Sequence, residues 1–439
     1  MTTPRPLTPF ELAHFDREAQ LGSVPKAEVA LYIGTTVRGE IDVEILRRVL
    51  AELAAGHAVL RAVVVRAADG GLGFVLREDY QPPLEIRAGG DDEYQSLINS
   101  KHDWGEGLFK GYLLRDGELS RIVLAAHHGV CDGRSMFPLV HEMWERYSAH
   151  LAGQPLPLSD VDRELPDGVD AQLARTVSDA ELDAFMTQLA AIAAATDPAT
   201  SAPVHLPIDG DGIGDPRGRF TLRSLDLSAD DSEAIVTTAR AHGVSVNSLL
   251  AGAALTALRT ELDVDSGPAM MLATHCVDVR DQLSPPLSGS TILNCVSGVP
   301  TPVFASADAD PIELARIVEV GVRGGVEARF PALILRALSR GIDPEAAGMP
   351  TIVPSLGLSN IGRMPAYPIP PNLELVRNFV YGMGEQMPPT MTMFTLGDRL
   401  TVQVDYDTVE HSHAQMGRVT EAMRQQLRHL CDLAPTKAG

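Results

Sequence analysis

Residues 121–135 constrain the fold of this chain more than any other stretch. An apolar run typical of a β-strand ends in two adjacent histidines, His127 and His128, and is followed by a turn that contains Asp132-Gly133 and then by a helical pattern. Successive residues of a strand point to opposite faces, so the two imidazoles cannot enter the same cavity. We therefore expect one histidine to be structural and the other to be available for chemistry.

The spacing His-His-x-x-x-Asp-Gly suggests acid–base chemistry. The strand would aim one imidazole into a cavity and the turn would bring Asp132 back beneath it, while Gly133 permits a backbone conformation that a side chain would resist. An imidazole with a pKa of about 6.5 is largely neutral near pH 7, so it can accept a proton from an attacking hydroxyl or amine. Such general-base help accelerates a reaction by roughly 10²- to 10⁴-fold.

Two other interpretations of the motif are considered. The histidines could be a core pair satisfied by backbone groups, but an Asp-Gly at this offset in a strand-to-helix turn argues against that. A metal site would use four neighbouring side chains: His127, His128, Cys131 and Asp132. Adjacent strand residues diverge and no second cluster of ligands follows, so we expect no metal.

Composition limits the class of protein. With 439 residues, 45% of them hydrophobic and 21% charged, the chain should form two or three globular domains. No run approaches the roughly 20 apolar residues of a membrane span, and the first residues lack the layout of a signal peptide. The net charge of −22 argues against nucleic acid and against attraction to anionic membranes. We expect a cytoplasmic protein without stable membrane insertion.

The cysteines give no sign of a disulfide framework or a metal motif. They are scattered, with no CxxC pair, and we expect them to be reduced and mostly buried. They are Cys131, Cys276, Cys295 and Cys431. His275 and Cys276 lie together in an apolar strand pattern and are predicted to pack in the core.

Strand and helix patterns alternate along the chain, which predicts an α/β fold. Strands are expected at 29–37, 57–65, 74–77, 109–114, 121–128, 220–227, 269–277, 291–299, 351–359, 373–381, 390–396 and 400–406. Helices are expected at 41–56, 91–100, 135–151, 178–195, 228–243, 246–262, 311–327, 332–339 and 411–433.

The two halves of the chain contain strands and helices in similar proportion, which predicts two related α/β domains. Residues 1–155 form the first domain, with the histidine motif, and residues 218–439 the second. Between them, residues 156–217 are rich in Pro and Asp and contain one helical pattern, as expected of a linker.

The sequence His-His-Gly-Val-Cys-Asp-Gly resembles the signature of the condensation-domain and chloramphenicol-acetyltransferase-like acyltransferases. Further segments resemble this superfamily in the same order along the chain: 57–61, 241–250, 277–280 and 359–362. The chain is most similar to the polyketide-associated acyltransferases of the phthiocerol/phthiodiolone dimycocerosyl transferase family. The second motif of the plant-type members, Asp-Phe-Gly-Trp-Gly, is absent, and residues 378–382 resemble it only weakly.

This resemblance implies two chloramphenicol-acetyltransferase-like domains in a V-shaped pseudo-dimer, with a tunnel between them. It implies that His128 is the general base toward a hydroxyl or amine acceptor, or that it positions this nucleophile. His127 would be structural, and Asp132 would be architectural, paired with Arg280 rather than with His128. Gly133 would keep the tunnel clear.

Four further residues are weaker candidates. Ser359 and Asn360 could donate hydrogen bonds near a developing oxyanion, although a strand-end turn explains them equally well. Arg316 and Arg323 lie in an arginine-rich stretch of an acidic chain, which suggests a docking face for CoA phosphates or an acidic carrier protein. A solvated helix face is the alternative for both arginines.

Together these features predict an acyltransferase that esterifies an alcohol in lipid or polyketide-derived lipid biosynthesis. The donor would be an acyl thioester of CoA or of an acyl carrier protein. We expect a lipidic acceptor, no metal or redox cofactor, and a monomer. Two alternatives stay open: a free-standing condensation enzyme that forms amides, and a non-catalytic scaffold that binds carrier proteins or lipids.

Overall fold

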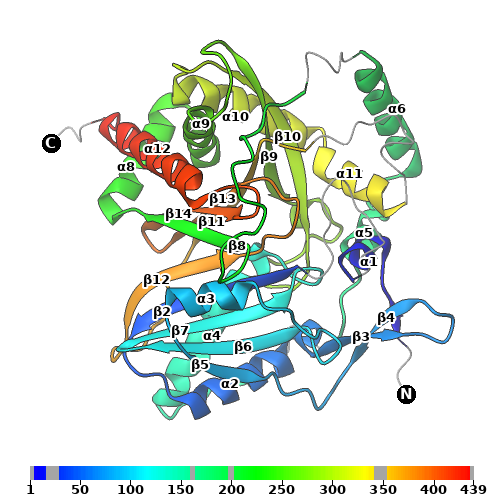
Figure 1. Ribbon diagram of the computed structural model, residues 1–439. Helices are drawn as coiled ribbons and strands as arrows, with labels where there is room; N and C mark the ends of the chain where they lie inside the picture. Colours follow the sequence, from blue (N-terminus) through cyan, green and yellow to red (C-terminus); the bar gives the residue numbers. More distant parts are fainter. Residues whose placement is uncertain (1–3, 16–28, 159–163, 196–201, 341–352, 436–439) are drawn as a thin grey trace.

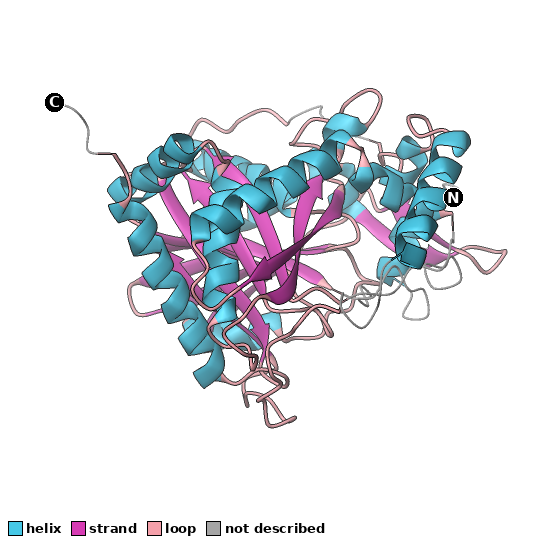
Figure 2. Ribbon diagram, turned by 90° about the horizontal axis from the view of Figure 1, so that it is seen from above, coloured by secondary structure: helices cyan, strands magenta, loops and turns pink. Residues whose placement is uncertain are grey.

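The computed structural model describes residues 4–15, 29–158, 164–195, 202–340 and 353–435. Two mixed sheets dominate the described part of the chain, one of five strands and one of six, and a third sheet has three strands. In Figure 1 the five-stranded sheet occupies the lower part of the molecule and the six-stranded sheet the upper part. Seen from above, helices line the outside of the sheets (Figure 2).

The five-stranded sheet has the order β12–β2–β7–β6–β5. Its strands are β2 (Ala30–Arg38), β5 (Leu84–Ala88), β6 (Phe109–Asp116), β7 (Leu119–His127) and β12 (Glu374–Tyr381). Three helices pack against this sheet or at its edge: α2 (Val43–Gly56), α3 (Asp91–Ile98) and α4 (Gly133–Leu151). Helix α2 forms because Leu46, Val49 and Leu53 recur at helical spacing, and all three are fully buried.

The six-stranded sheet has the order β10–β9–β11–β13–β14–β8. Its strands are β8 (Phe220–Asp226), β9 (Ala269–Asp278), β10 (Val296–Ala305), β11 (Leu356–Met364), β13 (Thr390–Leu396) and β14 (Arg399–Asp407). The associated helices are α8 (Ala229–His242), α9 (Val246–Arg259), α10 (Pro311–Glu327) and α12 (His413–Asp432), with a short 3₁₀ turn η2 (Arg280–Gln282) after β9. Helix α9 is buried along almost its whole length and packs against α10 and α12.

A smaller core lies beside the two main sheets. It contains side chains of α1 (Pro9–Phe15), α5 (Val169–Leu173), α6 (Asp179–Ala195) and α11 (Phe330–Ser339). The three-stranded sheet, in the order β1–β4–β3, comprises β1 (Arg5–Pro6), β3 (Ala62–Arg66) and β4 (Leu72–Leu76), and the turn η1 (Ala58–Arg61) precedes β3.

One strand of the second half completes the sheet of the first half. The chain leaves β11 in the six-stranded sheet, pairs as β12 with β2, and then returns as β13 beside β11. In Figure 1 the orange β12 therefore lies against the blue β2. The side-chain amide of Gln403 in β14 fixes this crossing, because it donates to the carbonyl of Val380 (2.6 Å) and accepts from its N–H (3.2 Å).

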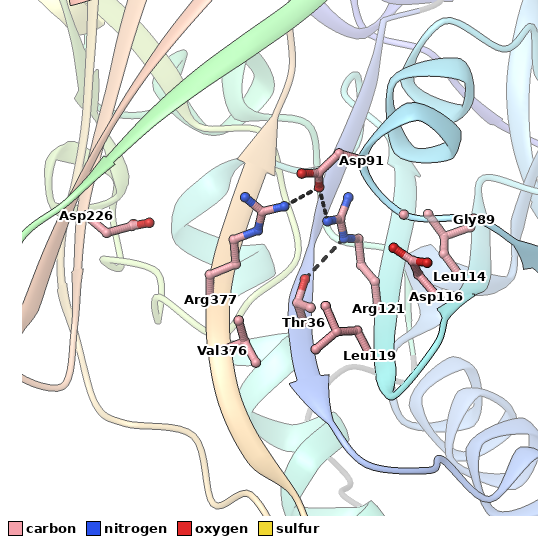
Figure 3. Close-up of a pocket in the computed structure, with 11 residues that line it drawn as sticks. Thr36, Gly89, Asp91, Leu114, Asp116, Leu119, Arg121, Asp226, Val376 and Arg377 are labelled. Carbon is pink, nitrogen blue, oxygen red and sulfur yellow. Dashed lines mark hydrogen bonds and ion pairs between the residues drawn. The ribbon is translucent and has the colours of Figure 1, made fainter. Parts of the chain in front are cut away.

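A cluster of charged side chains also holds β12 in place (Figure 3). Asp91, at the start of α3, contacts both Arg121 of β7 and Arg377 of β12. Arg121 donates to Thr36 Oγ1 (3.1 Å) and lies over the ring of Tyr94, 4.9 Å from its centroid. The cluster borders a cavity of about 260 Å³ whose lining carries both signs of charge.

Most predicted elements are present within a few residues of their expected bounds, but several expectations were wrong. The predicted strand 291–299 begins only at Val296, and it continues through Pro300 and Pro302 because β10 is an edge strand, where a missing N–H is tolerated. The predicted strand 57–65 begins with the turn η1. The region expected to contain one helix contains α5 and α6.

Two strands of the second half differ in part from the expectation. Of the predicted core pair, His275 is buried but Cys276 is exposed, because alternate residues of β9 face opposite sides. The predicted strand 351–359 begins at Leu356, and its first two positions lie outside the described residues.

Among the described residues, no single helix is long and apolar enough to cross a membrane. Helices α8 and α9 meet the length and composition criteria only as a pair, and this pair is bent by 99°.

Candidate active site

His127 ends β7 and lies in a sealed aromatic pocket. Its ring is fully buried, stacks on Phe15 with centroids 3.9 Å apart, and meets the edge of Trp104 at 5.2 Å. Its Nδ1 accepts the N–H of Gly129 (3.0 Å). Burial, with smaller contributions from His128 and His102, lowers the pKa of His127 to about 3, so the ring is neutral at neutral pH.

His128 follows the strand and lies in a different environment from His127. It is partly exposed, and its Nδ1 lies 2.9 Å from the carbonyl oxygen of Cys131. A carbonyl only accepts hydrogen bonds, so Nδ1 carries the proton and the lone pair of the neutral ring is on Nε2. The main chain of His128 is also fixed, because its N–H donates to the carbonyl of Val29 (2.8 Å). This is the tautomer that a base acting through Nε2 requires.

Asp132 does not lie beneath the His128 imidazole, as the spacing alone had suggested. Both carboxylate oxygens face Arg280, which donates from Nη1 to Oδ2 (2.7 Å) and from Nη2 to Oδ1 (3.2 Å). Asp132 also caps α4 by accepting the N–H of Ser135 (2.9 Å), and it accepts the N–H of Cys295 (2.9 Å). The carboxylate therefore joins α4 to the segment that follows η2.

Arg280 is almost completely enclosed, with 2% of its side chain exposed. It donates to the carbonyl of Leu293 (2.6 Å) and also contacts Asp278 (3.0 Å). Burial alone would lower the pKa of Arg280, but the charge of Asp132 raises it above its usual value. Arg280 thus stays charged inside the protein and holds the two halves of the chain together at the motif.

Gly133 opens α4 against β11. A Cβ at this position would lie 3.0 Å from Cδ1 of Ile361, so the absence of a side chain allows the helix and the strand to approach each other closely. The next residue, Arg134, donates to the carbonyl of Ile361 (3.1 Å).

Asn294 was not singled out from the sequence, yet it contacts the motif directly. Its side-chain amide donates to the carbonyl of His128 (2.7 Å) and lies 3.5 Å from Nε2 of His14. Asn294 is 3% exposed and comes from the same segment that binds Asp132 and Arg280. No local pattern marks an asparagine in a loop, so only the tertiary structure reveals it.

Ser359 and Asn360 lie in β11, which approaches the motif through their neighbour Ile361. Asn360 Oδ1 accepts the N–H of Gly362 (2.9 Å) across a bulge in the strand. The segment is not the strand end considered as the alternative, because β11 continues beyond this bulge to Met364. A role as oxyanion donors stays a prediction.

Arg316 and Arg323 lie on α10, at the top of Figure 1, whereas the motif lies between β7 and α4 in the lower part. Both side chains are exposed, and Arg323 pairs with Glu319 one turn earlier (2.6 Å). A docking role for these arginines also stays a prediction.

The four side chains considered as metal ligands do not converge. Burial raises the pKa of the Cys131 thiol well above its usual value, and both oxygens of Asp132 face Arg280. In the described ranges, no group of three or more His, Cys, Asp or Glu side chains could hold a metal ion.

A mainly apolar cavity of about 580 Å³ lies along α4, between the two halves. Phe137 and Pro138 begin its lining, about one helical turn after Gly133, and Met364 and Tyr367 close it from the second half. Tyr367 is buried, and its hydroxyl has no hydrogen-bond partner among the described residues. Both the size and the position between two parts of the chain are typical of small-molecule sites.

The fold is shared with solved acyltransferases and condensation domains. Polyketide synthase associated protein 5 from Mycobacterium tuberculosis superimposes with a TM-score of 0.68 at 20% identity, over 97% of this chain and 98% of that chain. The condensation domain from Monacolin K polyketide synthase gives 0.69 at 13% identity, over 99% and 98%. Trichothecene 15-O-acetyltransferase from Fusarium sporotrichioides gives 0.71 at 13% identity, over 97% and 94%. The fold is therefore that of the condensation-domain and chloramphenicol-acetyltransferase-like acyltransferases, with two such lobes.

Sequence comparison narrows this class. Residues 216–405 match the model of the phthiocerol/phthiodiolone dimycocerosyl transferase C-terminus. The phthiocerol/phthiodiolone dimycocerosyl transferase of Mycobacterium leprae (strain TN) is 25% identical over 314 residues, which cover 67% of this chain and 69% of the relative. That of Mycobacterium ulcerans (strain Agy99) is 24% identical over 350 residues, covering 77% and 78%. The chain is thus similar in sequence to these dimycocerosyl transferases.

Proposed function

We propose that this protein transfers an acyl group from a thioester of CoA or of an acyl carrier protein to a hydroxyl acceptor, with His128 as general base. The observation that carries the proposal is the hydrogen bond from Nδ1 of His128 to the carbonyl of Cys131 (2.9 Å), which leaves the lone pair on Nε2. The curated relatives, named as dimycocerosyl transferases, support acyl transfer in lipid biosynthesis.

In the proposed reaction the acceptor hydroxyl donates its hydrogen bond to Nε2 of His128. As the oxygen attacks the thioester carbonyl, a new C–O bond forms and the proton passes to Nε2. The tetrahedral intermediate then collapses, the C–S bond breaks, and the proton on Nε2 returns to the departing sulfur. The products are an ester and a free thiol, and no resident metal or redox cofactor takes part.

The chemistry of the surroundings is consistent with an apolar substrate. The 580 Å³ cavity begins about one turn of α4 after Gly133, and its walls are mainly apolar. We propose that it takes up the hydrocarbon part of a lipidic acceptor or of the acyl chain. Apolar surface removed from water contributes roughly 25 cal/mol per Å², so a long chain would gain much of its affinity there.

Two neighbouring residues are proposed to fix the main chain around His128. Asn294 fixes its carbonyl, and Asp132 fixes the turn that presents the Cys131 carbonyl. Both act through the position of His128 and not on the substrate, so their removal should lower the rate without changing which atom accepts the proton.

The test is His128→Asn, assayed with an acyl-CoA and a long-chain alcohol by release of free CoA. Asparagine can still donate to the Cys131 carbonyl but has no base at the position of Nε2. We expect a loss of roughly 10²- to 10⁴-fold in kcat with an intact fold. His429→Asn, at an exposed position of α12, is the matched control. Transfer by His128→Asn at the wild-type rate would contradict the base role.

The two alternatives differ in measurable ways. An amide-forming enzyme would release the thiol faster with an amine than with the alcohol of matching length. A scaffold would bind an acylated carrier protein but release no thiol with either acceptor.

A further inference from the structure

Gly382 lies directly beside the reactive edge of His128. It follows β12, whose last residue, Tyr381, pairs with Tyr32 of β2. A Cβ at Gly382 would lie 3.4 Å from Cδ2 and 3.6 Å from Nε2 of His128. Cδ2 and Nε2 form the edge of the imidazole that faces away from the Nδ1 hydrogen bond. The strand that crosses from the second half thus brings a residue without a side chain to this edge.

The space beside this edge is where an acceptor has to lie. An oxygen that gives its proton to Nε2 must come within about 2.6–3.2 Å of that nitrogen. Non-bonded carbon atoms pack best at about 3.5–4.0 Å from each other, so a methyl group at Gly382 would compete with the carbon atoms attached to the acceptor oxygen. Both Gly382 and His128 are partly exposed.

We propose that Gly382 is a specificity-determining residue, because its missing side chain leaves room beside Nε2 of His128 for an acceptor that is branched next to its hydroxyl group. The inference rests on the proposed function, since it assumes that the acceptor meets Nε2. It means that a residue of the second half, Gly382, sets the width of the acceptor site.

A need for glycine in the backbone does not explain this residue. Gly382 is not among the glycines with a left-handed backbone, so alanine fits its conformation. The nearest atom to an added Cβ is Cδ1 of Leu31 at 3.0 Å, the end of a side chain that would have to shift by a few tenths of an ångström. Gly382→Ala should therefore fold, and its main consequence is a methyl group beside the imidazole.

The experiment compares Gly382→Ala with the wild type, using one acyl-CoA and two isomeric alcohols. These are n-octanol and the ethylhexanol that carries its ethyl branch on the carbon next to the CH₂OH group. The isomers have the same composition and differ in width near the hydroxyl group. We expect the ratio of kcat/KM for n-octanol over ethylhexanol to rise about tenfold or more, since one misplaced carbon in a tight site changes kcat/KM by that order. Gly324→Ala, at an open position on α10, is the control and should leave the ratio unchanged.

The outcomes separate this inference from the proposed function. A purely structural disturbance would lower both alcohols equally, and that result, or an unchanged ratio, overturns the role of Gly382. If His128→Asn is inactive and the ratio in Gly382→Ala is unchanged, only this inference fails. If His128→Asn transfers at the wild-type rate, the proposed function fails and the inference fails with it.

Discussion

Two of the ion-pair clusters that join the halves of this chain differ in how far water reaches them. Beside the motif, the side chains of Asp132 and Arg280 are 0% and 2% exposed. At the edge of the five-stranded sheet, Asp91 is 71% exposed although it contacts both Arg121 and Arg377 (Figure 3). Water and salt screen an exposed pair but hardly affect a buried one. Similar contacts should therefore differ greatly in what their loss costs.

The buried cluster also fixes the geometry of the candidate active site. Asp132 caps α4 and binds the N–H of Cys295, next to the Asn294 that holds the carbonyl of His128. The exposed cluster holds β12 against β7 and α3 but touches none of these groups. The buried cluster, the first junction between the halves, thus affects both the stability of the protein and the geometry of the site. The exposed cluster, the second junction, affects only the edge of the five-stranded sheet.

The largest effect is expected at the buried junction. Asp132→Ala leaves the charge of Arg280 without its main partner inside the protein, which typically costs about 3–5 kcal/mol of unfolding free energy. Urea unfolding measures this loss of free energy. Asp132→Asn keeps the acceptor that caps α4 and isolates the charge, and Asp278→Ala is the control because it leaves Arg280 its buried partner. A loss below 1 kcal/mol in Asp132→Ala would remove the contrast between the junctions.

The burial of His127 should also make the free energy of unfolding depend on pH. Burial lowers the pKa of His127 to about 3. The unfolded chain takes up a proton near pH 6.5 and the folded one does not, so stability is lost as pH falls from 6.5 toward 3. We expect His127 to cost about 2 kcal/mol at pH 5 relative to neutral pH.

Unfolding of His127→Asn at several pH values checks this expectation. Asparagine retains an acceptor for the N–H of Gly129 but does not titrate, so the variant should lose less stability on acidification than the wild type. Identical slopes in the two proteins would show that His127 is not the group responsible.

A smaller effect is expected at the exposed junction. Arg377→Ala should lower the free energy of unfolding by about 1 kcal/mol or less, because exposed ion pairs contribute little. The difference from wild type should shrink further in high salt. Urea unfolding at two salt concentrations measures both. A loss as large as that of Asp132→Ala would mean that burial does not distinguish the two junctions.

The smallest effect is expected away from both junctions. Arg316→Glu combined with Arg323→Glu should raise the KM for an acyl-CoA a few-fold at low salt and leave stability unchanged, because long-range attraction of an anionic donor is screened by salt. Steady-state kinetics at two ionic strengths test it. An unchanged KM would assign α10 to the solvated helix face considered as the alternative.

Local patterns were sufficient where one face or one turn decides the structure. The apolar period of α2 and the strand pattern that leads into the histidine pair follow from neighbouring residues, and both elements are found within a few residues of their predicted bounds. The resemblance to the acyltransferases then pointed to Arg280 as the partner of Asp132, a pair 148 residues apart. Period and propensity alone had placed Asp132 beneath the imidazole.

Other features depend on contacts that no local pattern contains. The sequence was divided at a linker into two halves, but it did not indicate that β12 leaves the second half to pair with β2. A strand pattern shows that a segment will pair and not which strand it pairs with, because the partner is chosen by long-range packing.

The sequence by itself determined that a strand leads into two adjacent histidines, and the alternation of strand residues predicted that their rings face different ways. The tertiary structure decided how each is surrounded: Phe15 and Trp104 enclose His127, whereas the Cys131 carbonyl orients His128. It also brought Asn294 and Gly382 to His128 from the second half. The reason is physical, since alternation along a strand is a local property of the backbone, whereas burial and the tautomer of a ring depend on groups that only folding brings together.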